Sequence, residues 1–364
     1  MRLLTLPVFR SLFLGLGLLL AGPGRAQTVN VDAVTRYWEI TDGLRQNKPI
    51  TDEVWRDFLE IPGNKVYVRG IFSPEDLVRY RRALEVVYMP RYDSIRQVRL
   101  QKQSWYYVLV NDYKEREAEH RAFIATVAKS PEAVALMYQK AYQYLPARNH
   151  TKVADLKIYY EALGNDATSQ QEGLFYSLRA TFDAREVAPG LLEGHEMHHQ
   201  LRTGKDFGPI APDDQGIMEI MASTQNEGLA DLIDKPATLA LPGDTHGIRE
   251  WALDPAPAFL AKLDSTIQAR ALGGAPATGR YYRRLSNGSN GHVPGFFMAR
   301  TIQRNGYTKQ LVEAADDPFA FFYLYQKATR KDKEHAPPFS AAAMRYLKAL
   351  EARYAKGPRS KAAS

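Results

Sequence analysis

The chain contains no cysteine in its 364 residues. Disulfide bonds are therefore excluded, and so is a lipid anchor attached through cysteine. Stability has to come from a buried core and from any bound metal. With 45% hydrophobic and 24% charged residues, the composition is that of a globular protein long enough to bury a sizeable core in two lobes.

Long apolar runs are also scarce. The run at residues 11–20 follows Arg2 and Arg10, is too short to span a bilayer, and leads into the small residues of 21–26. This pattern predicts a signal peptide over residues 1–26 that is cleaved near Ala26. We therefore expect a secreted or periplasmic protein without a stable membrane anchor.

A strong charge of either sign is missing as well. The formal net charge is +7, and removing residues 1–26, which carry three arginines and no acidic residue, leaves 7 − 3 = +4. Such a mild excess gives no reason to expect nucleic acid as a partner.

Histidine is rare, with eight in the chain, and two of them form the pattern H-E-x-x-H. On a helix, His195 and His199 lie one turn apart on the same face, so both imidazoles can reach a single ion. Glu196 lies about 100° further round, where it can reach a water beside the metal. Pro189 fits the first turn of this helix and Gly204 its end. We expect one Zn²⁺ per chain, with Glu196 as the general base.

A catalytic zinc site needs a third protein ligand, and the next predicted helix offers one. Glu227 and Asp231 are four residues apart and share a face, so Glu227 can bind the metal while Asp231 accepts the far N–H of a ligand histidine. Glu219 and Asp213 are the acidic alternatives. Glu227 ranks first because it alone has an acidic partner at helical spacing.

These two helices resemble the gluzincin metallopeptidases, in which H-E-x-x-H is followed by N-E-x-x-x-D or a close variant. The whole chain is also similar to a family of secreted bacterial proteins assigned as zinc-dependent peptidases from this motif. The resemblance implies that His195, His199 and Glu227 bind zinc, that Glu196 is the base, and that Asp231 orients a ligand histidine. It also implies an edge strand beside the zinc that can pair with a substrate backbone.

A competing zinc-peptidase pattern is excluded. Metzincins require glycine at position 202 and histidine at position 205, where this chain has Arg202 and Lys205. The third ligand is therefore sought among acidic residues.

A loop further along the chain offers donors for the oxyanion of a tetrahedral intermediate. His292 lies in a glycine-flanked loop before a helix predicted at about 295–305 and is the first choice, with Tyr282 and then Tyr281 behind it. The alternative is a histidine that only caps the helix or shapes the turn.

The sequence divides into three regions after the signal peptide. Residues 27–150 are expected to be helical, with Thr51 and Ser73 as N-caps. Residues 151–236 should contain a sheet and the zinc-binding helices, and residues 237–364 a helical lobe that closes a cleft. Aromatic residues recur in the first region and are assigned to packing: Trp38, Trp55, Phe58, Trp105, Tyr106 and Tyr107.

Alternating apolar residues predict two strands, at residues 156–162 and 174–182, joined by a polar loop at 164–172. The second zinc helix should begin at Asp213 or Asp214 and stop before Pro236. The expected fold class is α+β and mainly helical, with a small antiparallel sheet beside the two zinc helices.

The function that follows is an exported zinc metallopeptidase acting on a peptide or protein substrate. Two alternatives stay open. One is a zinc hydrolase that cleaves another amide or an ester, because the same water chemistry serves both. The other is an exported protein that binds peptides without cleaving them.

Overall fold

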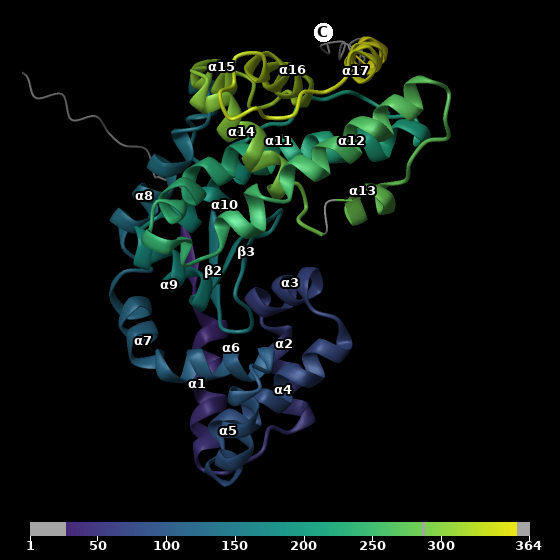
Figure 1. Ribbon diagram of the computed structural model, residues 1–364. Coiled ribbons are helices and arrows are strands. Elements are labelled where there is room, and N and C mark those ends of the chain that lie inside the picture. Colours follow the sequence, from purple (N-terminus) through teal and green to yellow (C-terminus); the bar gives the residue numbers. More distant parts are fainter. Residues whose placement is uncertain (1–26, 286–287, 355–364) are drawn as a thin grey trace, which may run out of the picture.

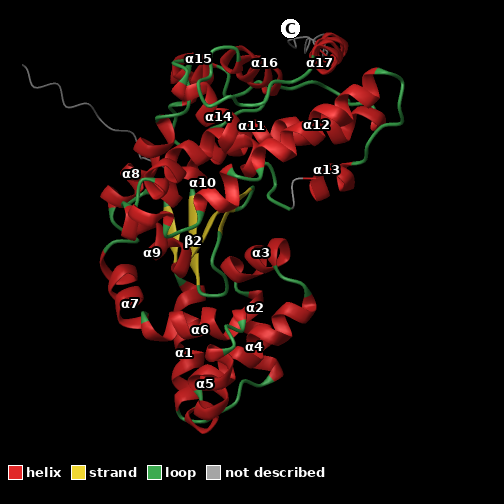
Figure 2. Ribbon diagram, viewed as in Figure 1, coloured by secondary structure: helices red, strands yellow, loops and turns green. Residues whose placement is uncertain are grey.

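The computed structural model describes residues 27–285 and 288–354. The signal peptide predicted for residues 1–26 lies outside these ranges. Helices surround one small four-stranded sheet (Figure 1, Figure 2), which confirms the mainly helical α+β class. Within the two described ranges, no helix has both the length and the apolar character needed to cross a bilayer.

Short helices form the first part of the chain: α1 (Asp32–Arg45), α2 (Asp52–Glu60), α3 (Pro62–Ile71), α4 (Pro74–Tyr88), η1 (Pro90–Tyr92), α5 (Asp93–Gln101), α6 (Trp105–Glu115), α7 (Glu117–Thr126), α8 (Pro131–Tyr142) and η2 (Ala147–Asn149). The two predicted N-caps are confirmed, because the Thr51 and Ser73 side chains accept hydrogen bonds from the first turns of α2 and α4. Trp38 and Trp55 are buried as expected. Trp105 is 48% exposed, with the Arg179 guanidinium over its ring.

The sheet is mixed and has the order β1-β2-β4-β3. Its strands are β1 (Thr28–Asn30), β2 (Lys157–Glu161), β3 (Ala167–Gln170) and β4 (Gly173–Ser177). The pairs β1–β2 and β2–β4 are parallel, and the pair β3–β4 is antiparallel. The expected antiparallel hairpin was therefore wrong, because β3 forms inside the segment predicted as a loop and allows β4 to run parallel to β2.

Two further expectations about these segments were wrong. Residues 178–182 begin helix α9 (Leu178–Val187), since the Ser177 hydroxyl accepts a hydrogen bond from Ala180 N and caps the helix. The first region is also not entirely helical, because β1 extends the sheet beside β2. A three-residue strand is too short to show a period in the sequence.

The remaining helices complete the fold: α10 (Leu191–Leu201), α11 (Pro212–Leu239), η3 (Pro242–Asp244), η4 (Arg249–Leu253), α12 (Ala256–Ala271), α13 (Gly279–Leu285), α14 (His292–Arg304), α15 (Thr308–Glu313), α16 (Pro318–Thr329) and α17 (Ala341–Tyr354). Helix α11 continues through Pro236, where it was expected to stop. Proline removes one backbone N–H there. The helix still continues, because the Thr238 hydroxyl donates to the Asp234 carbonyl and the Ala240 N–H donates to the Pro236 carbonyl.

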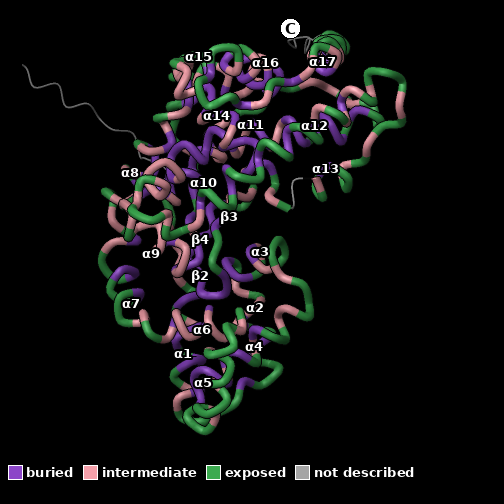
Figure 3. Tube along the Cα trace, in the orientation of Figure 1, coloured by how far each residue is buried: buried purple, intermediate pink, exposed green. Residues whose placement is uncertain are grey.

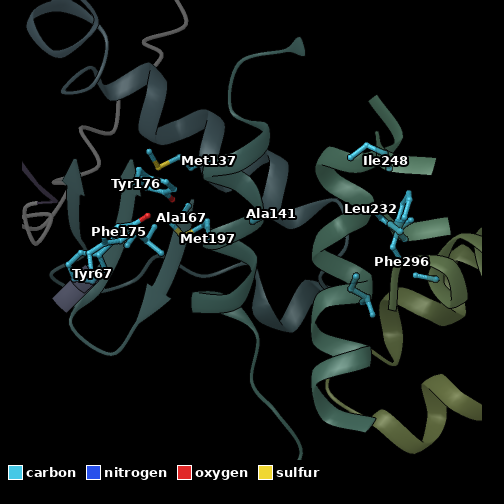
Figure 4. Close-up of a cluster of buried hydrophobic side chains, with 14 of the residues drawn as sticks. Tyr67, Met137, Ala141, Ala167, Phe175, Tyr176, Met197, Leu232, Ile248 and Phe296 are labelled. Carbon is cyan, nitrogen blue, oxygen red and sulfur yellow. The ribbon is translucent and has the colours of Figure 1, made fainter. Parts of the chain in front are cut away.

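The buried residues follow the sheet and the helices α10 and α11 above it (Figure 3). Behind α10, Met197 packs near Tyr176 of β4 and Met137 of α8 (Figure 4). On the other side of α11, Leu232 and Phe296 belong to the same core. Helices α10 and α11 are thus held from both sides.

Candidate metal centre

Helix α10 carries the H-E-x-x-H residues and packs closely against α8. It begins after Gly190, whose φ of +79° suits glycine at this tight entry. Gly194 lies so close to Lys140 of α8 that a methyl group there would overlap the lysine side chain. His195 is 3% exposed, and the two imidazole centroids of His195 and His199 are 4.9 Å apart. Both histidines can therefore offer Nε2 to one point.

Helix α11 brings Glu227 to the same point. Its Oε2 lies 3.2 Å from His199 Nε2 and 3.6 Å from His195 Nε2. Four ligands at 2.0–2.1 Å from a tetrahedral zinc are separated from one another by about 3.3 Å. The observed separations match that spacing.

The donor atoms also fit a metal chemically. Glu227 Oε2 is buried and has no hydrogen-bond partner among the described residues, a costly state for a carboxylate oxygen. One ligand atom from each of His195, His199 and Glu227 lies within 4.8 Å of the others, a set that could hold an ion. Two imidazoles and a carboxylate are the donors that zinc accepts in catalytic sites.

The charges of the site favour a bound cation. Burial alone would lower the pKa of His195, but Asp234 and Glu227 outweigh it and raise the pKa well above its usual range. Burial would raise the pKa of Glu227, yet His199 and His195 hold it well below its usual range. The same carboxylates that stabilise a proton on His195 would stabilise a metal ion in its place.

The carboxylate that orients His195 differs from the one predicted. Asp234 Oδ1 accepts from His195 Nδ1 at 3.3 Å, whereas Asp231 is 3.8 Å from that nitrogen, beyond hydrogen-bond distance. The Lys235 ammonium lies 2.6 Å from Asp234 Oδ2 and 3.6 Å from Asp231 Oδ1. Burial would raise the pKa of Asp234, but Lys235 and His195 lower it, so this buried carboxylate stays ionised.

Asp231 instead orients His292. Its two carboxylate oxygens lie 3.0 and 3.2 Å from His292 Nδ1, and His292 Nε2 is 3.5 Å from Glu227 Oε2. Burial would lower the pKa of His292, but Asp231 outweighs it and raises the pKa above the usual value. His292 thus directs Nε2 at the metal-binding residues while Asp231 holds Nδ1.

His292 lies on a helix and not in the loop that was predicted. Helix α14 begins at this residue because Gly291, with φ of +103°, turns the chain into it. One turn later Gly295 touches Gly228 of α11, where a methyl group added to Gly228 would be 2.5 Å from the Gly295 carbonyl oxygen. This backbone contact sets the distance between His292 and Glu227.

Glu196 lies in the wall of a cleft of about 880 Å³ together with the metal-binding residues. Its exposed fraction is 6%, and burial raises the pKa of its carboxyl group above the usual value. A raised pKa suits a group that takes and returns a proton near neutral pH.

The two sides of the cleft come from different parts of the chain. One wall is the edge strand β3 with the end of α3, including Asp166, Ser169 and Ile71. Gln200 of α10 donates to Ser169 Oγ and to the Gln170 carbonyl, both at 2.7 Å, and so fixes β3 beside the metal helix. The opposite wall consists of η4, α12 and the start of α14.

Several sequence candidates lie elsewhere. Tyr282 is 4% exposed and packs against Gly216, three turns before Glu227, and it does not line the cleft. Tyr281 pairs with the Thr266 hydroxyl. Among the alternative third ligands, Glu219 lies beside Gly279, and Asp213 pairs with Arg270 at 3.3 Å. None of these four candidates is near His195 and His199.

Sequence reasoning missed three residues of the site, Asp234, Lys235 and Trp251. Asp234 is seven residues after Glu227, which places it on the same helix face and was a usable signal. Lys235 is four residues after Asp231 on the same helix, which was a usable signal as well. Trp251 enters the cleft only through the packing of η4 against α14, which leaves no local pattern in the sequence.

Two histidines and a glutamate from adjacent helices, with a buried carboxyl group beside them in a cleft, thus form a set of residues that could hold a metal ion. A family model described as "Putative zinc dependent peptidase (DUF5700)" matches residues 55–334. Because this match spans well over half of the chain, the protein belongs to that family. The matched range includes every residue of the candidate centre. Neither the curated proteins nor the solved structures gave a match.

Proposed function

We propose that this protein is an exported zinc metallopeptidase of the gluzincin type that binds one Zn²⁺ through His195, His199 and Glu227. The observation that carries the proposal is the convergence of two imidazoles, the buried one of His195 and the half-buried one of His199, on the otherwise unpartnered Oε2 of Glu227. The carboxyl group of Glu196 lines the same cleft. Family membership supports both the zinc and the peptidase class.

Zinc bound there would supply a Lewis acid that polarises the scissile carbonyl and acidifies a water molecule. Glu196 takes the proton of the attacking water and later delivers it to the leaving amine. Its raised pKa supports this role, because it makes the carboxylate a better proton acceptor than an exposed glutamate.

His292 donates a hydrogen bond from Nε2 to the oxyanion. The Asp231 carboxylate supports this role by accepting from Nδ1, which fixes the ring and favours the protonated form. Asp234 holds His195 in the tautomer that leaves Nε2 free for the metal. Lys235 keeps Asp234 ionised through the 2.6 Å ion pair.

The substrate is a peptide or protein segment that lies in the cleft with its backbone along β3. This strand is at the edge of the sheet and lines the cleft, so its outer side can pair with an extended chain. The proposed export rests on the signal peptide predicted for residues 1–26. Nucleic acid is not an expected partner, because the net charge of the chain is only mildly positive.

The test is a digest of a peptide library by purified mature protein in three states: as isolated, after chelation, and after zinc is restored. We expect about one equivalent of zinc, loss of cleavage on chelation and recovery with zinc. Cleavage that survives complete removal of the metal would overturn the proposal.

A further inference from the structure

The α12 side of the cleft has an aromatic platform that the proposed chemistry does not use. Trp251 of η4 is 43% exposed, whereas the next two residues, Ala252 and Leu253, are 0% and 7% exposed. Its ring centroid is 5.9 Å from that of His292, so the platform adjoins the reacting groups. An exposed tryptophan inside a cleft is unusual, because burying so large an apolar surface is favourable.

Apolar residues extend this platform along the same wall. Pro255, Ala258 and Phe259 line the cleft at the start of α12, and Val293 lines it beside His292. Trp251 is held in place by one turn of π-helix, a local irregularity that often occurs at functional sites. The wall therefore offers a preformed surface for a large apolar side chain.

A single unpaired cation lies at the rim of this wall. Lys262 lines the cleft one turn after Phe259 and is exposed, and no carboxylate of residues 27–285 and 288–354 is within ion-pair distance of it. The cleft's other ammonium group, that of Lys235, is already bound to Asp234 at 2.6 Å. Lys262 is therefore the ammonium group of this cleft that is available to a ligand.

The opposite wall has the opposite charge. Asp166 precedes β3, is exposed to the cleft, and has no ion-pair partner in the described part of the chain. A ligand carboxylate is therefore attracted to the α12 wall and repelled from the β3 wall, which fixes the side on which it binds.

We propose that the α12 wall selects peptide substrates in which a large apolar or aromatic residue is followed by a carboxylate, with Trp251 receiving the side chain and Lys262 the carboxylate. The carboxylate can come from an acidic side chain or from the C-terminus of the peptide. This proposal rests on the proposed peptidase function and specifies the substrate class of the same site.

The test measures binding separately from cleavage, in a zinc-loaded Glu196→Gln background. Calorimetric titration uses the peptides acetyl-Ala-Ala-Phe-Glu-amide, its Phe→Ala and Glu→Gln analogues, and acetyl-Ala-Ala-Phe with a free C-terminus. We expect the Phe peptide to bind at least about 10-fold more tightly than the Ala analogue, as a central aromatic contact does. The carboxylate should add about 3-fold at low salt and less at high salt. Comparing the two acidic peptides identifies which carboxylate source is preferred.

Variants assign these preferences to residues. Trp251→Ala should abolish the preference for Phe, and Trp251→Phe, which keeps an aromatic platform, should retain most of it. Lys262→Gln should remove only the preference for the carboxylate. Trp105→Ala and Lys348→Gln are the controls, since both residues are exposed and neither lines the cleft.

The outcomes separate this proposal from the proposed function. Equal binding of the Phe and Ala peptides by the protein with Trp251 would overturn the proposed substrate selection, and so would an unchanged preference for Phe in Trp251→Ala. Neither result would bear on the proposed peptide hydrolysis. Selective binding by a wild-type protein that cleaves no peptide would overturn the peptidase function and leave the selection standing.

Discussion

The contact between Gly228 and Gly295 makes the position of His292 sensitive to a single methyl group. In Gly295→Ala the new methyl group would be 2.7 Å from Gly228 N and would also overlap the Thr224 carbonyl oxygen. The overlap with the Thr224 carbonyl oxygen is the tighter of the two, and relieving it requires the two helix backbones to separate by about 1 Å. Because His292 is one turn before Gly295, it moves away from the metal ligands by a similar distance.

A displacement of about 1 Å at a reacting group costs about 100-fold in rate. We therefore expect kcat of Gly295→Ala to fall by about 100-fold, with a loss of about 1 to 3 kcal/mol in the free energy of unfolding from overpacking. Zinc content should stay close to wild type, because His195, His199 and Glu227 lie on α10 and α11.

The assay combines kcat, zinc content and thermal unfolding of the same preparations. Gly43→Ala is the matched control, because a methyl group there would meet nothing within 4 Å. Alanine in that helix should leave kcat unchanged and stabilise the protein by about 0.5 to 1 kcal/mol. A folded, zinc-loaded Gly295→Ala with wild-type kcat would refute the claim that this contact positions His292.

Three further outcomes follow from the site and its surroundings. Asp234→Ala should weaken zinc affinity by about 10- to 100-fold in a competition titration with a chelator, and an unchanged affinity would remove Asp234 as the orienting group of His195. His292→Ala should lower kcat by about 100- to 1000-fold with little change in KM or zinc, while Tyr282→Phe, a change away from the cleft, should have wild-type kcat. Burial raises the pKa of Glu161 from 4.5 to about 8, so the folded state holds this proton more tightly and stability should fall as pH rises from about 4.5 to 8. Glu161→Gln should remove that fall. Its free energy of unfolding relative to that of wild type should therefore increase by up to about 4 to 5 kcal/mol between pH 5 and pH 9. The same difference from wild type at both pH values would contradict this reasoning.

Local patterns in the sequence predicted several helices and the start of two of them. Thr51 and Ser73 cap helices as expected because a cap depends on residues within one turn. The spacing of His195 and His199 likewise needs only a helix. The order of the strands could not be predicted, because the pairing of β2 with β4 depends on contacts between distant segments.

The surroundings of the metal centre were harder to predict. The assignment of Asp231 to a ligand histidine followed helical spacing alone, whereas the position of α14 brings His292 to Asp231 and leaves Asp234 for His195. Tyr282 was chosen for its nearness to His292 in the sequence. The structure turns it toward Gly216, so adjacency along the chain gave no information about the cleft.

The proposed hydrolysis of peptides requires Glu196 to act on water without binding the metal. The most direct measurement compares peptide cleavage by wild type and Glu196→Gln at equal, measured zinc content. We expect the variant to keep its zinc and its thermal stability and to lose cleavage by about 100-fold or more. Wild-type cleavage by a zinc-loaded Glu196→Gln protein would contradict it.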